Sequence, residues 1–136
     1  MTPLLDVRDL RVSFNIRREG DMPWTPPRLL HAVGGVNFTL NPGETLGIVG
    51  ESGCGKSTLA RALIQMVPAT GRVIWQDGTD LLSLSRGQML KYRADIQMVF
   101  QDPLASLNPR MTVGQIIAEP LTTHHKGLPA AEIKAR

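Results

Sequence analysis

A glycine-rich loop followed by a lysine and two hydroxyl residues carries the clearest chemical signal in the sequence. "GESGCGKS", residues 50–57, fits the pattern G-x-x-x-x-G-K-[ST], which is typical of loops that hold phosphate groups. Glycines let successive main-chain N–H groups converge on an anion. A helix beginning near residue 56 would add its positive N-terminus. We therefore predict a nucleotide phosphate site that includes Gly50, Glu51, Ser52, Gly53, Cys54, Gly55, Lys56, Ser57 and Thr58.

Charged and hydroxyl side chains are needed because the main chain alone binds too weakly. A helix terminus contributes at most about 2 kcal/mol, whereas micromolar binding needs about 8 kcal/mol. Charge-assisted hydrogen bonds of about 1.5–3 kcal/mol each supply the difference. We expect Lys56 to reach the β- and γ-phosphates, Ser57 to bind Mg²⁺ and Thr58 to contact the α-phosphate. The predicted ligands are therefore ATP and Mg²⁺.

The only cysteine, Cys54, lies inside this loop. No candidate base stands beside it in the sequence, and phosphate-binding loops use main-chain groups and metal rather than a thiol. We therefore interpret Cys54 as a small loop residue and not as a nucleophile. An electropositive loop would nevertheless make its thiol reactive.

The elements that must position the loop follow from the hydrophobic pattern. "TLGIVG", residues 45–50, is predicted to be a short buried strand. Helical spacing begins at Lys56 and runs to Pro68. Before the loop, alternating apolar residues predict strands at 4–14 and 32–40, with a loop at 15–29 and a turn at 41–44.

After the first helix, the pattern predicts a mixture of strands and helices. We expect a strand and turn within 71–81, a second buried strand at 96–100, and helices at 112–121 and 128–136. The last helix is still in mid-pattern at Arg136, so we expect a truncated chain.

Composition excludes several classes of protein. The 136 residues are enough for one modest domain. The net charge of +3 comes from scattered basic residues, which argues against a nucleic-acid surface. No apolar run approaches the ~18 residues of a membrane span, and the N-terminus does not resemble a signal peptide. We therefore expect a soluble, cytoplasmic chain that reaches a membrane only through partners.

A longer stretch separates the families that share this loop. The segment "DIQMVFQDPLASLNPRMTVGQIIAEPL", residues 95–121, together with "HAVGGVNFTL" and "LLDVRDLRVSF", closely resembles the ATP-binding subunits of ABC transporters. Among these it resembles the oligopeptide and dipeptide importers. The resemblance implies an α/β P-loop NTPase fold, with an antiparallel β subdomain and P-loop core over residues 1–103 and the start of a helical subdomain over 104–136.

The same resemblance assigns two residues outside the loop. Gln101 in "VFQDP" corresponds to the Q-loop glutamine, which contacts Mg²⁺ and the attacking water and senses the transmembrane partner. It is thereby a candidate catalytic residue together with Lys56. Phe14 matches the aromatic position that stacks on adenine, although an alternating strand equally predicts a core phenylalanine there.

Three family motifs are missing from the sequence: LSGGQ, a Walker B strand ending in Asp-Glu, and a switch histidine. Asp102 follows an apolar run, but Gln101 before it and Pro103 after it match the Q-loop pattern instead. We therefore expect weak Mg-ATP binding and negligible turnover from these 136 residues.

The resemblance also implies partners and a place in the cell. They are transmembrane permease subunits, a second ATP-binding subunit and, indirectly, an external solute-binding protein, at the cytoplasmic face of the membrane. Nickel, glutathione or other solutes remain alternatives to peptides. Two other interpretations of the function stay open. One is a complete small P-loop kinase or GTPase with Asp102 as metal ligand, and the other is a nucleotide-binding module without catalysis.

Overall fold

The computed structural model describes residues 2–136, and the chain divides into two compact units between Ser85 and Arg86. The first unit contains β1 (Leu5–Ile16), β2 (Arg28–Leu40), α1 (Lys56–Leu63), β3 (Thr70–Trp75) and η1 (Leu81–Ser83). The second contains α2 (Arg86–Arg93), α3 (Pro103–Ser106), α4 (Val113–His124) and α5 (Ala130–Ala135). This division falls earlier than the predicted subdomain boundary at 103/104, which stays a prediction.

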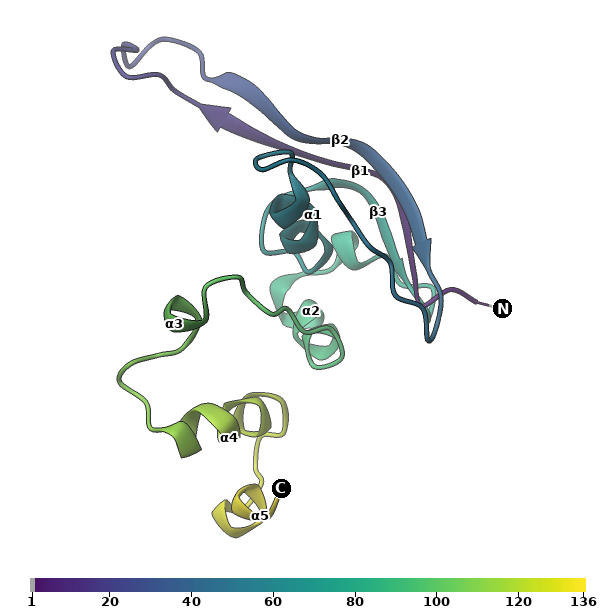
Figure 1. The fold of residues 1–136 in the computed structure, drawn as a ribbon, viewed down its shortest axis with the longest axis vertical. Coiled ribbons are helices and arrows are strands. Elements are labelled where there is room, and N and C mark those ends of the chain that lie inside the picture. The colour runs from purple at the N-terminus through teal and green to yellow at the C-terminus, as the bar shows by residue number, and fades with distance from the viewer. Residues whose placement is uncertain (1) are drawn as a thin grey trace. The chain divides into compact units, whose positions relative to one another are not determined.

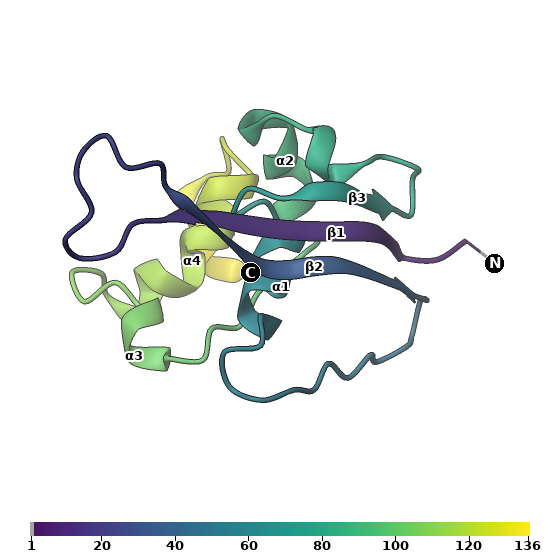
Figure 2. The same cartoon turned by 90° about the horizontal axis from the view of Figure 1, so that it is seen from above.

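The first unit is built on an antiparallel sheet in the order β2-β1-β3. Figure 2 shows β1 between its two neighbours, and Figure 1 shows β1 and β2 continuing past β3 as a long hairpin. Successive side chains along each strand point to opposite faces of the sheet, and the apolar ones gather on one of them. Its fully buried members are Val7, Leu10, Val12 and Val73.

A bulge at Asp9 lets β1 keep its apolar residues on that one face. The buried positions change from odd to even between Val7 and Leu10. Asp9 takes up the extra residue with φ 46°, and its N–H donates to Asn37 Oδ1 at 2.9 Å. The predicted strand at 4–14 is confirmed, but its simple alternation at Leu10, Val12 and Phe14 holds only after the bulge.

The helix after the glycine loop is shorter than predicted. α1 ends at Leu63, and Gln65 turns the chain with φ 56°, whereas the spacing predicted a helix running to Pro68. The Gln65 side chain donates to the carbonyl oxygens of Leu81 and Leu84. These tertiary bonds stabilise the early turn, and nothing in the local spacing signals them.

Two predicted buried strands are wrong in this structure. Residues 45–50 and 96–100 belong to no strand, and the side chains of Val49 and Val99 are 92% and 95% exposed. A strand exists only when a neighbour satisfies its main-chain groups. In the described part of the chain, the sheet contains β1, β2 and β3 alone. Apolar composition predicted burial here but could not supply the neighbouring strand.

α4 and α5 confirm the helices predicted at 112–121 and 128–136, whereas α2 and α3 were not predicted. α4 begins after Thr112, whose hydroxyl accepts from Gln115 N–H while the Gln115 side chain accepts from Thr112 N–H. This capping box fixes the start of the helix. α5 follows Pro129, close to the predicted beginning. No helix among residues 2–136 has the length and apolarity that crossing a membrane requires.

Candidate functional site

The glycine loop joins the extended segment 45–50 to α1 and packs against β2. Gly53 and Gly55 both have positive φ, 80° and 101°, a conformation that favours glycine. A Cβ on Gly55 would collide with the carbonyl oxygen of Ala32 in β2. The second pattern glycine is therefore required both by its own backbone and by the strand above it.

The first pattern glycine has a different role. A Cβ on Gly50 would lie 2.6 Å from Cys54 Sγ and 3.9 Å from Lys56 Nζ. Side-chain atoms of the loop thus fill the space that a larger residue at position 50 would need. A side chain at position 50 would therefore have to displace the Cys54 thiol.

Lys56 folds back over the loop that precedes it. Its Nζ donates to the carbonyl oxygens of Gly50 and Glu51 at 2.6 and 2.8 Å and lies 3.5 Å from Cys54 Sγ. Cys54 N–H donates to the Glu51 carbonyl at 3.3 Å. The lysine ammonium is therefore held at the mouth of the loop, where an anion would meet it.

The N-terminus of α1 is open. Gly55 supplies no side-chain cap, and the first turn contains no acidic residue. The first N–H to find a helical partner is that of Leu59, which donates to Gly55 at 2.8 Å. The N–H groups of residues 56–58 thus lack partners within the helix, and they carry the positive end of the helix dipole. An anion is the natural partner for this arrangement.

A shallow hollow of about 240 Å³ adjoins the loop on the apolar side of β2. Its lining comes from three stretches of the first unit: β2, the extended segment and the loop with the start of α1. Its residues are Ala32, Val33, Gly34, Val36, Ile48, Val49, Cys54, Gly55, Lys56 and Leu59. The sequence pattern found the loop but not its contacts with Ala32 and Val33, because no local signal reports a strand packed against it.

The residues of the loop fit a nucleotide phosphate with a divalent ion. Ser57 lies exposed in the first turn of α1, beside the partnerless N–H groups. No group of three His, Cys, Asp or Glu side chains among the described residues could hold a metal by itself. Mg²⁺ typically takes few protein ligands and completes its shell with phosphate oxygens and water. A serine hydroxyl next to a phosphate site suits that preference.

Phe14 and Gln101 lie on different units. Phe14 is half-buried on β1 opposite Leu30, in the same unit as the loop. Gln101 is exposed in the second unit, immediately before Asp102. Asp102 caps α3 by accepting from Leu104 and Ala105 N–H at 3.0 and 3.2 Å. This capping gives Asp102 a structural role without a metal, and the Q-loop role of Gln101 stays a prediction.

Comparison with known proteins gives the chain a family context. The sequence model of the family described as ABC transporter matches residues 33–135. The oligopeptide transport ATP-binding protein OppF of Salmonella typhimurium is 55% identical over 134 residues, covering 98% of this chain and 40% of that protein. AppF of Bacillus subtilis, also named an oligopeptide transport ATP-binding protein, is 47% identical over 90% of this chain and 37% of its own length.

A further relative and a solved structure widen this context. The glutathione import ATP-binding protein GsiA of Shigella dysenteriae is 46% identical over 98% of this chain and 21% of its own length. The dimeric ATP-binding cassette MJ0796, bound to ADP and Pi, matches with a TM-score of 0.77 at 25% identity, over 96% of this chain and 53% of its own. The chain therefore spans about two fifths of OppF and half of the solved cassette.

Proposed function

Because this chain belongs to the ABC transporter family, we propose that it binds ATP as part of an importer whose cargo is oligopeptides or dipeptides. The names of its similar relatives support peptides as the cargo. A glutathione importer subunit is similar over the same share of the chain, so a small peptide-like solute is the common chemistry. The partners on this proposal are permease subunits and a second ATP-binding subunit, at the cytoplasmic face of the membrane.

The open N-terminus of α1 beside the Lys56 ammonium carries the proposal. An ATP γ-phosphate placed there meets partnerless N–H groups and a lysine whose present partners are main-chain carbonyls. Hydrogen bonds from charged groups to phosphate are stronger than those to neutral carbonyls. Lys56 can therefore exchange its bonds to Gly50 and Glu51 for bonds to the β- and γ-phosphates.

Three further residues would contact the nucleotide or its metal ion. Ser57 binds Mg²⁺ and Thr58 contacts the α-phosphate, while Phe14 stacks on the base. Mg²⁺, when bound, neutralises the charge that develops on the phosphates during transfer. By the family resemblance, we propose that Gln101 in a full-length importer subunit contacts the ion and the attacking water and links the nucleotide to a permease subunit.

Turnover requires groups that these 136 residues do not contain. LSGGQ, a Walker B Asp-Glu and a switch histidine are missing from the sequence. The loop can position phosphates, but the acidic residue that polarises the water in this family follows the Walker B strand, which these residues lack. We therefore expect binding of Mg-ATP by this chain with no hydrolysis above background.

Equilibrium dialysis with labelled ATP and Mg²⁺, paired with a phosphate-release assay, tests the proposal on the purified chain. Saturable binding without phosphate release is the expected result. Hydrolysis that disappears in Lys56→Ala would contradict the absence of turnover. Transfer of phosphate to an added acceptor would instead support a small kinase, and no saturable binding would refute the nucleotide site.

A further inference from the structure

The outer part of the β1–β2 hairpin places an arginine next to the position expected to hold the nucleotide base. Phe14 pairs with Leu30 across the two strands, and Ile16 pairs with Arg28 one step further along. Side chains two residues apart on a strand share a face, and cross-strand partners share it too. Phe14, Ile16, Leu30 and Arg28 therefore form one surface, here called the hairpin platform.

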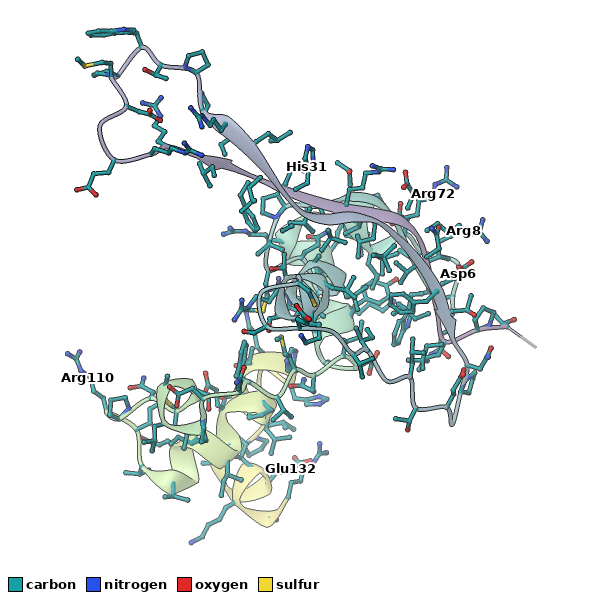
Figure 3. All side chains as sticks on the ribbon, turned by 45° about the horizontal axis from the view of Figure 1, so that its top comes forward. Asp6, Arg8, His31, Arg72, Arg110 and Glu132 are labelled. Atoms are coloured by element: carbon teal, nitrogen blue, oxygen red, sulfur yellow. The ribbon has the colours of Figure 1, made fainter. Side chains whose placement is uncertain are left out.

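The platform continues the face of the sheet that meets the glycine loop. Val12 and Val33, the buried pair that precedes Phe14 on the hairpin, lie on this face, and Val33 also lines the hollow beside the loop. Ser13 and His31 occupy the opposite face, where their side chains are hydrogen-bonded at 3.0 Å. Figure 3 shows His31 and Arg72 on the sheet strands, away from the loop. Phosphates at the loop would thus direct a base toward Phe14 and its neighbours.

The distance between diagonal residues of the platform matches the space that a flat ring needs when it is contacted on both faces. Diagonal neighbours on adjacent strands lie about 7–8 Å apart. Two van der Waals contacts of about 3.5 Å each, one on either side of a ring, span the same distance. Phe14 and Arg28 are such diagonal neighbours. A purine can therefore fit between the phenyl ring and the planar guanidinium.

The exposed fractions of the platform residues also favour a bound base. Ile16 and Leu30 are 40% and 47% exposed, which is unfavourable for apolar side chains with nothing to contact. Arg28 is also exposed. A bound base would cover the two aliphatic side chains and give the guanidinium an aromatic partner.

We propose that Arg28 closes over the base, so that the base is held between the Phe14 ring and the Arg28 guanidinium. This inference rests on the proposed nucleotide function. The contact is made to the face of the ring and not to its edge, so Arg28 strengthens binding of nucleotides while discriminating little between adenine and guanine.

The test compares ATP with inorganic triphosphate, which has the phosphates but no base. Calorimetric titration of the 136-residue chain uses Arg28→Ala and a matched control, Arg72→Ala, which removes the same charge from the opposite face of the sheet. Arg28→Ala is expected to weaken ATP about fivefold and to leave triphosphate unchanged, and Arg72→Ala to change neither. Arg28→Lys is expected to resemble Arg28→Ala, because an ammonium does not stack as a planar guanidinium does.

The outcomes separate this inference from the proposed function. If Arg28→Ala binds ATP as tightly as the parent, the clamp is refuted while the phosphate site stands. If it weakens ATP and triphosphate equally, Arg28 acts on the phosphates through charge, and the clamp is again refuted. If the parent binds neither ligand, the proposed function fails, and the clamp fails with it. Thermal unfolding of each variant, expected to match the parent, shows that lost binding is not lost folding.

Discussion

The Nζ atom of Lys56 lies 2.6 Å from the carbonyl oxygen of Gly50, so the lysine closes the loop by binding the loop's own first residue. A second bond, to the Glu51 carbonyl at 2.8 Å, strengthens this arrangement. A bound polyphosphate would compete with these two carbonyl oxygens for the same ammonium. These main-chain carbonyl oxygens are weaker acceptors for the ammonium than a phosphate would be.

Cys54 offers a direct report on occupation of the loop. Its side chain is exposed, and its Sγ lies 3.5 Å from Lys56 Nζ. A nucleotide bound to the loop would cover the thiol, so Mg-ATP is expected to slow alkylation of Cys54 at least severalfold. Mass spectrometry of the chain after timed exposure to iodoacetamide gives the rates. Equal rates with and without Mg-ATP would place the nucleotide elsewhere, and AMP, which lacks the β- and γ-phosphates, serves as the control ligand.

Gly55→Ala is expected to destabilise the fold more than Gly20→Ala. Both glycines have similar positive φ, 101° and 94°, but a Cβ at position 55 meets the Ala32 carbonyl, whereas at position 20 it meets nothing within 4 Å. Backbone strain is thus common to both variants, and the collision adds about 1–3 kcal/mol at position 55 alone. Urea unfolding measures the difference. Equal free energies of unfolding for the two variants would mean that the loop does not pack against β2.

Val49 and Val73 can test whether residues 45–50 form the buried strand that the hydrophobic pattern predicted or the exposed segment that the structure has. Val73 is fully buried in β3, whereas Val49 is 92% exposed. Truncating Val73 to alanine is expected to lower the free energy of unfolding by about 2 kcal/mol, and the same change at Val49 by less than about 0.5 kcal/mol. Chemical denaturation of both variants checks this. A loss at Val49 as large as that at Val73 would show that residues 45–50 form a buried strand after all.

The sequence was most informative where function depends on residues close together in the chain. The loop pattern predicted a helix beginning near Lys56 after a glycine turn, and α1 begins at Lys56 after Gly55 with φ 101°, because such a loop is a local structure with strict backbone needs. The role of each of these residues in binding stays a prediction. The family resemblance is confirmed by the match over residues 33–135.

Long-range contacts account for what the sequence could not predict. The early end of α1 depends on Gln65 reaching Leu81 and Leu84, sixteen or more residues away. The extended segments 45–50 and 96–100 have the composition of buried strands, but pairing depends on a neighbour that a local pattern cannot identify. Likewise the platform of Phe14 and Arg28 depends on the register of β1 with β2, which a bulge near Ala32 shifts.

The most direct test of the phosphate site is a calorimetric titration of Mg-ATP into the parent chain, Lys56→Ala and Lys126→Ala. Lys126 is an exposed lysine of the second unit, so its removal controls for net charge. We predict that Lys56→Ala loses at least about tenfold in affinity, since it removes charge-assisted bonds of about 1.5–3 kcal/mol, and that Lys126→Ala binds like the parent. If Lys56→Ala binds Mg-ATP as tightly as the parent chain, the glycine loop is not the nucleotide site.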